Sequence, residues 1–312
     1  MVTIAIDTVQ FHLKEYHDFT WLKSLGRVFS VFEENDSGNI SFGVSRGTNR
    51  YFVKAAGLKT SHAVLPPENA IQCLKRAVKV YEDIRHPNLI ELTEHRAVDD
   101  IYIAIFKWVD GECLYDHWNF AKYTGNPQLK SPAVRFRTLP VEKRLKSAEV
   151  LFSFLAAAAA CGYTAIDFYD GSIIYDFKTD TTTICDIDLF RKNPVFNDMG
   201  ENFWGSRRLK SPEEYKLHAP VDERTNVFTL GALLFHIFGS YSREELNEIC
   251  RKSAFVPCAR ENWQLNEAAY RAAQKAVLSD RNERYSTIEE FHTAWNRALT
   301  DKGKDQSCIT TV

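Results

Sequence analysis

Two acidic residues, Asp167 and Asp186, are the strongest chemical signal in the chain. Each follows a short apolar or β-branched stretch. Between them the sequence predicts two short strands, at 173–175 and 181–184, joined by a polar turn at 176–180. We expect this hairpin to hold both carboxylates at one end of a small sheet. Paired carboxylates in a cleft suit a divalent cation together with a general base, which is the combination that moving a phosphoryl group requires.

The composition is that of a soluble globular protein with one large core or two modest ones. The chain has 312 residues, of which 45% are hydrophobic and 26% are charged. Its formal net charge of −2 provides no overall field toward nucleic acid or an anionic membrane, and its most apolar run, 150–161, is too short to cross a bilayer. Seven cysteines without a Cys-x-x-Cys pair argue against a disulfide framework or a zinc cage. We therefore expect a cytoplasmic protein with neither nucleic-acid nor membrane partners.

The pattern of predicted elements changes near residue 107. The first part reads as three strands within Phe29–Lys54, a helix at Glu68–Ile84, and strands at Ile90–Leu92 and Ile101–Phe106. The second part is mainly helical, with helices predicted at 141–162, 224–238, 244–252, 266–277 and 287–300.

This pattern predicts an α+β fold in two lobes. A small antiparallel β-sheet lobe with one helix would span 20–107, and a larger, mainly helical lobe would span 108–300. Around these lobes we expect an N-terminal extension at 1–19, an irregular insertion at 115–140 and a flexible tail at 301–312.

Several ordered segments have counterparts in a known family. Tyr51–Lys54 is a strand that ends in lysine, His86–Ile90 follows the predicted helix, Ile105–Leu114 links the two parts, and Ala165–Ile174 carries Asp167. In this order they resemble the third strand, the helix-to-strand signature, the hinge and the catalytic loop of the protein-kinase-like superfamily, in particular a divergent bacterial-type serine/threonine protein kinase.

Later landmarks extend the resemblance. Gly205–Glu213 resembles the end of an activation segment, with Ser211-Pro212-Glu213 where the family has Ala-Pro-Glu, and Asn226–Gly231 resembles the start of the buried helix. The resemblance implies an ion pair between Glu213 and Arg284, a structural feature of protein-type kinases. It also implies that the Asn226 amide accepts backbone N–H bonds from the catalytic loop.

The resemblance implies a role for each candidate site residue. Asp167 would accept the proton of the substrate hydroxyl, Lys54 would orient ATP, and Asp186 would bind the Mg²⁺ (or Mn²⁺) that bridges the phosphates. The remaining candidates are Ser172 and Asp188 as further metal ligands, and Lys107, Val109, Ser37 and Gly38 as ATP-binding residues.

The sequence also departs from the family pattern. The turn expected to cover the phosphates, 33–39, has one glycine and three acids, and Ala77 stands where a helix glutamate would pair with Lys54. Ala165 and Ile166 replace the histidine and arginine of the catalytic loop, and Tyr169 replaces its lysine. The acidic turn and Ala77 affect phosphate binding and the positioning of Lys54, and the loss of the catalytic-loop arginine removes the partner of a phosphorylated activation loop.

Three functions remain open at this point. We predict an ATP- and Mg²⁺-dependent protein serine/threonine kinase, because Lys54, Asp167 and Asp186 occur together with the Gly205–Glu213 segment. The Asp167-x-x-x-Gly171 spacing resembles aminoglycoside and choline kinases, so a small-molecule acceptor is an alternative. The other alternative is a pseudokinase scaffold that binds a partner protein, favoured by Ala77, Ala165 and Ser172.

Overall fold

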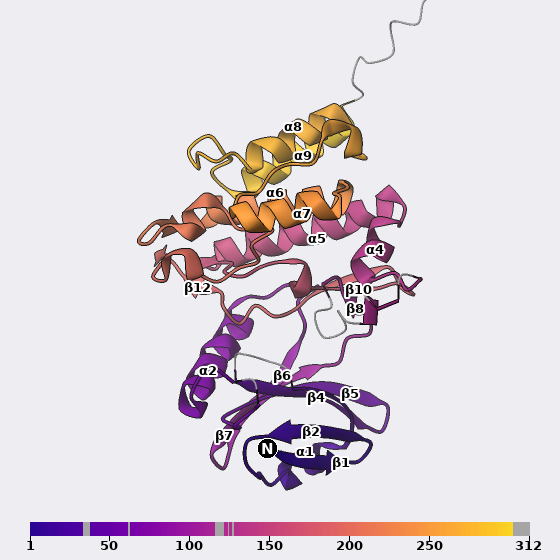
Figure 1. The fold of residues 1–312 in the computed structure, drawn as a ribbon, viewed down its shortest axis with the longest axis vertical. Helices are drawn as coiled ribbons and strands as arrows, with labels where there is room; N and C mark the ends of the chain where they lie inside the picture. The colour runs from indigo at the N-terminus through magenta and orange to yellow at the C-terminus, as the bar shows by residue number, and fades with distance from the viewer. Residues whose placement is uncertain (34–37, 62, 116–121, 124, 127, 302–312) are drawn as a thin grey trace, which may run out of the picture.

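The chain folds into an α+β structure in which a sheet-rich part and a helical part occupy opposite ends of the molecule (Figure 1). The computed structural model describes residues 1–33, 38–61, 63–115, 122–123, 125–126 and 128–301. The predicted tail beyond residue 301 and several residues of the predicted insertion at 115–140 lie outside these ranges. No helix within them is long and apolar enough to cross a membrane.

The sheet-rich part is built on one antiparallel sheet with the strand order β3-β4-β5-β7-β6. Its strands are β3 (Arg27–Phe32), β4 (Asn39–Arg46), β5 (Asn49–Ala56), β6 (Leu92–Val98) and β7 (Ile101–Lys107). The three strands predicted first and the strand at 101–106 are confirmed. The strand predicted at Ile90–Leu92 is wrong in extent, because β6 begins at Leu92.

Helix α2 (Pro67–Asp83) packs against β5, β6 and β7. It begins at a proline, which suits the first helical turn, and it ends before His86-Pro87, because the residue before a proline disfavours helical geometry. Its buried side chains recur at Ala70, Leu74, Ala77 and Tyr81 on one face of the helix. This face joins α2 to the main hydrophobic cluster of the helical part.

The first residues complete the core of the sheet-rich part, which the sequence analysis did not predict. Strands β1 (Val2–Ile6) and β2 (Val9–Leu13) form a hairpin, and helix α1 (Thr20–Leu25) follows it. Phe11 and Phe19 are buried with Phe42 of β4, and the Phe11 and Phe42 rings lie edge to face with centroids 5.3 Å apart. The segment 1–19, expected as an extension, therefore shares one core with the sheet.

The helical part contains the elements that the periodicity predicts. Its helices are α4 (Pro132–Arg137), which lies in the predicted insertion, α5 (Val141–Ala160), α6 (Glu223–Phe238), α7 (Arg243–Lys252), α8 (Glu267–Ala276) and α9 (Ile288–Thr300). The side chains of Asn266 and Thr287 accept backbone N–H bonds that cap α8 and α9. Helix α6 is buried along most of its length and forms the centre of this part.

Short antiparallel pairs lie between the sheet and the helices (Figure 1). The predicted hairpin is confirmed as β10 (Ile173–Asp176) and β11 (Thr181–Ile184), and β8 (Glu112–Cys113) pairs with the other edge of β10. The remaining pairs join β9 (Tyr163–Thr164) to β12 (Arg191–Lys192), and β13 (Val195–Phe196) to β14 (Pro220–Val221).

If the first hairpin belongs to the core, Phe11→Ala should lower the free energy of unfolding by about 3–5 kcal/mol, because it removes a fully buried ring. Tyr16→Ala is the control, since Tyr16 is 72% exposed, and should change stability by less than about 0.5 kcal/mol. Urea unfolding of both variants measures the difference. Equal small effects would place the hairpin outside the cooperative unit.

Candidate functional site

The site is centred on Lys54, which strand β5 carries toward the segment that follows β11. The Lys54 Nζ lies 2.7 Å from Oδ2 of Asp188 and 3.3 Å from Oδ1 of Asp186. The lysine side chain is 13% exposed. Burial alone would lower the pKa of its ammonium group, but the charges of Asp188 and then Asp186 outweigh burial and raise that pKa above its usual value. The lysine is therefore held as a cation between two carboxylates.

Asp186 lies at the open end of the β10–β11 hairpin. Its side chain is 51% exposed, and its backbone has a φ of 52°, an uncommon conformation that Asp tolerates better than most residues. Two backbone hydrogen bonds join the hairpin to the segment after α2. The Ile90 N–H donates to Ile184 O, and the Ile184 N–H donates to Asn88 O. The carboxylate is thus presented to solvent from a fixed backbone.

Asp167 lies in the loop after β9, where α6 holds the backbone. The Asn226 Oδ1 accepts the Ala165 N–H at 2.9 Å, and the Asn226 Nδ2 donates to Ala165 O at 2.8 Å, as the resemblance implied for this amide. Asp167 also has a positive φ, of 57°. Residues held in such conformations concentrate at functional sites.

Tyr169 lies in the same loop as Asp167 and interacts electrostatically with both predicted acids. Burial raises the pKa of the Tyr169 hydroxyl, and the negative charges of Asp186 and Asp167 raise it further. Both carboxylates therefore lie within electrostatic reach of the same phenol. A Cβ at Gly171 would come within 2.5 Å of Tyr169 ring atoms, so a larger residue there would require the ring to move.

Asp188 lies at the centre of a hydrogen-bond network that was not predicted from the sequence. One carboxylate oxygen, Oδ2, binds Lys54, and the other, Oδ1, accepts a hydrogen bond from the Tyr81 hydroxyl at 3.1 Å. The same hydroxyl accepts the Ile187 N–H at 3.2 Å. Asp188, predicted as a metal ligand, thus has both oxygens engaged by protein groups. Tyr81 lies one helical turn after Ala77, on the same face of α2, and that spacing was the available signal.

Ser172 is fully buried beside the hairpin end. Its backbone carbonyl accepts the Cys185 N–H at 2.9 Å, next to Asp186, while its hydroxyl has no hydrogen-bond partner among the described residues. A buried hydroxyl without a partner is costly, and a bound cation or water would satisfy it. Within the same ranges, no group of three or more His, Cys, Asp or Glu side chains is arranged to hold a metal ion.

The described ATP-binding candidates other than Lys54 lie in or next to strands β4 and β7. Ser37 lies outside the described residues, and Gly38 is buried at the start of β4, close to Ala70 of α2. The Lys107 N–H already donates to Glu91 O, whereas Val109 packs against the main cluster. These contacts do not test whether the residues bind ATP, and their role stays a prediction.

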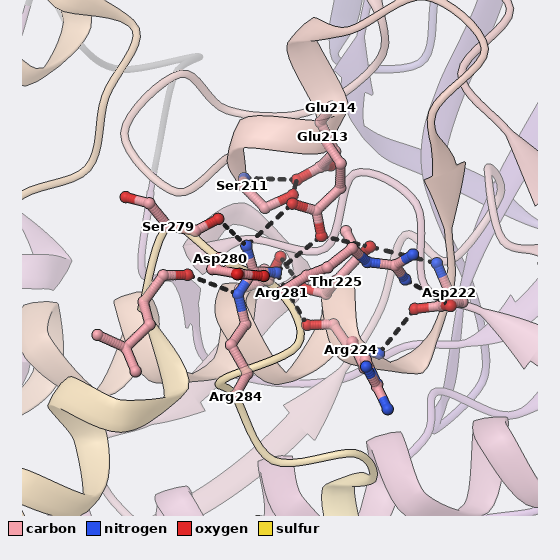
Figure 2. Close-up of polar contacts among 12 residues, drawn as sticks. Ser211, Glu213, Glu214, Asp222, Arg224, Thr225, Ser279, Asp280, Arg281 and Arg284 are labelled. Atoms are coloured by element: carbon pink, nitrogen blue, oxygen red, sulfur yellow. Dashed lines mark hydrogen bonds and ion pairs between the residues drawn. The ribbon is translucent and has the colours of Figure 1, made fainter.

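A buried ion pair anchors the segment that precedes α6. Arg284 donates from Nη1 to Glu213 Oε1 at 2.7 Å and from Nη2 to Oε2 at 3.0 Å, so the implied pair is present (Figure 2). Thr225 Oγ1 also donates to Glu213 at 2.9 Å. Burial would raise the pKa of Glu213, but Arg284 holds it below its usual value. The pair ties 211–215 to α6 and to the loop before α9.

No protein-family model matches the chain, and no curated protein shows significant similarity to it. Functional conclusions therefore depend on the residues and contacts described above.

Glu213→Gln should lower the free energy of unfolding by about 3–5 kcal/mol, because it leaves the fully buried Arg284 guanidinium without its counter-charge. Arg281→Gln is the control, since Arg281 pairs with the more exposed Asp222 nearby and should cost much less. Denaturant unfolding of the two variants measures this. Equal losses would contradict an anchoring role specific to Glu213.

Glu214 should make stability depend on pH. It is buried, accepts two hydrogen bonds from Ser211 through Oε2 (Figure 2), and burial raises its pKa from 4.5 to about 7. Because the folded-state pKa is raised, this contribution to stability is complete below pH 4.5 and is lost as pH rises through 7. Glu214→Gln preserves both bonds without a charge. We therefore expect its stability relative to the wild type to increase between pH 5 and 8, by about 1.4 kcal/mol per unit of pKa shift. Parallel pH profiles for the two proteins would contradict this.

Proposed function

We propose that the chain is an ATP- and Mg²⁺-dependent phosphotransferase with a two-lobe protein-kinase-like fold. The sheet-rich part and the helical part would be its two lobes. The observation that carries the proposal is the meeting of Lys54 with Asp186 at 3.3 Å, because it brings a strand lysine of one part to an exposed carboxylate of the other. Asp167 supplies a further carboxylate, whose charge acts on Tyr169 together with that of Asp186.

The residues divide the chemistry between binding and proton transfer. Lys54 would bind phosphate oxygens of ATP, and Asp167 would accept the proton of the acceptor hydroxyl. The half-exposed Asp186 carboxylate and the unpartnered Ser172 hydroxyl would suit a Mg²⁺ ion. Phosphate and water would supply its other ligands. When bound, this ion would neutralise charge that develops on the phosphates.

A protein serine or threonine is the acceptor we favour. The support is the anchoring of the Gly205–Glu213 segment by Arg284, since a peptide acceptor needs a fixed surface to bind. The six described cysteines are free thiols, which suits the cytoplasmic location expected from the sequence.

One observation favours a small-molecule acceptor instead. The Tyr115 and Tyr169 rings lie edge to face, 6.2 Å apart, and the Arg208 guanidinium lies 4.9 Å from the Tyr115 ring while it pairs with Asp170. This aromatic and basic wall borders the loop that carries Asp167. It could hold a compact acceptor by stacking and by charge.

The proposal predicts label transfer from γ-labelled ATP that requires both acids. Asp167→Asn should slow transfer by about 10²–10⁴-fold, the usual contribution of a general base, and Asp186→Asn should abolish transfer at ordinary Mg²⁺ concentrations. Label is followed on protein acceptors and on metabolites from a cell extract, which separates the two acceptor classes. Asp176→Asn is the matched control, since Asp176 lies at the opposite end of the hairpin.

Equal blanks from the wild type and both variants would contradict phosphotransfer and favour a scaffold that binds a partner protein. Undiminished label in the Asp186→Asn variant would point to a contaminating kinase.

A further inference from the structure

We propose that Asp188 and Tyr81 form the device that positions Lys54, in place of a carboxylate on helix α2. The effect of this device on catalysis rests on the proposed function. The positioning of Lys54 itself rests only on the contacts among the three side chains. It makes Asp188 the counter-ion of the lysine and Tyr81 a positioning residue that acts through Asp188.

The two carboxylates near Lys54 differ in exposure and distance. Asp188 is 19% exposed and its oxygen lies 2.7 Å from Nζ, whereas Asp186 is 51% exposed and lies 3.3 Å away. The shorter, less hydrated contact is the stronger one, because screening by water weakens ion pairs. Asp188 thus holds the lysine, and Asp186 keeps an open face for a cation.

Tyr81 supplies what α2 lacks. The expected glutamate position, Ala77, is a small buried residue, and one turn later the Tyr81 hydroxyl reaches Asp188. This hydroxyl donates to Asp188 Oδ1 and accepts the Ile187 N–H, so it fixes both the carboxylate and the backbone that carries it. Burial raises the pKa of Tyr81 far above its usual value, which keeps the hydroxyl protonated as a donor at neutral pH.

The Tyr81 ring is itself fixed by packing. It is 5% exposed and lies edge to face with Phe106 of β7, with centroids 4.8 Å apart. The contacts therefore form a chain from α2 through Tyr81 and Asp188 to Lys54 on β5. Helix α2 still sets the position of the lysine, but through a hydroxyl and a carboxylate of another segment rather than through its own acid.

Three variants test the device. Asp188→Asn removes the counter-charge, and Tyr81→Phe removes only the hydroxyl. Tyr163→Phe is the matched control, because the Tyr163 hydroxyl donates to Asp83 at 2.8 Å in a Tyr–Asp bond of the same kind away from Lys54. Thermal unfolding establishes that each variant is folded before the comparison is made.

The first readout is the rate at which an amine-acylating ester modifies Lys54, followed by mass spectrometry in the absence of nucleotide. The exposed Lys107 is the internal reference. Asp188→Asn should raise the modification of Lys54 relative to Lys107 by about tenfold, because a charge-assisted bond no longer protects the amine. Tyr81→Phe should raise it by about threefold. Tyr163→Phe should leave it unchanged.

The second readout is phosphotransfer. Tyr81→Phe should lower kcat by about tenfold with little change in KM for ATP, because misplacing Lys54 affects the transition state more than nucleotide binding. Tyr163→Phe should match the wild type. If Tyr81 had only a structural role, Tyr81→Phe would lower stability without lowering kcat selectively relative to KM.

The outcomes separate the device from the proposed function. Unchanged Lys54 modification in folded Tyr81→Phe and Asp188→Asn proteins would overturn the device even if the wild type transfers phosphate. Increased modification in both variants supports the device even if the wild type transfers none, in which case the proposed function fails alone.

Discussion

The structure depends on keeping one buried ammonium group charged. Lys54 lies on a strand of the sheet-rich part. Removing its charge from water costs free energy, which the nearby charges of Asp188 and Asp186 offset. Both carboxylates belong to the segment after β11, so the ion pairs join the two parts of the chain. Leaving the lysine unpaired would cost several kcal/mol, so these ion pairs hold the junction together.

The surrounding packing turns this junction into a fixed geometry. One hydrophobic cluster runs from α2 through α5 and α6 to α9, so the helix that carries Tyr81 and the loop that carries Asp167 rest on the same core. Asp167 and Asp186 keep uncommon left-handed backbone conformations within this frame. Asn226 fixes the loop that carries Asp167 through two hydrogen bonds to the backbone of Ala165. The backbone around both acids is therefore held by regular elements and their core.

Local patterns predicted the elements, and ordered motifs predicted some contacts. Alternation and turn residues indicated strands β3 to β5 and the β10–β11 hairpin, and the resemblance to the protein-kinase-like superfamily implied the pair of Arg284 with Glu213. The Tyr81–Asp188–Lys54 chain could not be predicted in this way, because a tyrosine on an apolar helix face normally indicates core packing. The β1–β2 hairpin was missed since its burial depends on Phe42, far along the chain. The contact that completes the site is therefore one that only tertiary packing shows.

In the function that we propose, Lys54 and Asp186 hold the phosphates of Mg·ATP between the two parts of the chain. Calorimetric titration of the protein with ATP, with and without Mg²⁺, tests it most directly. We expect the wild type to bind ATP more tightly when Mg²⁺ is present, and the Asp186→Asn protein, with its fold intact, to lose this effect of Mg²⁺. Absence of binding under all conditions, or the same Mg²⁺ dependence in the wild type and Asp186→Asn, would contradict it.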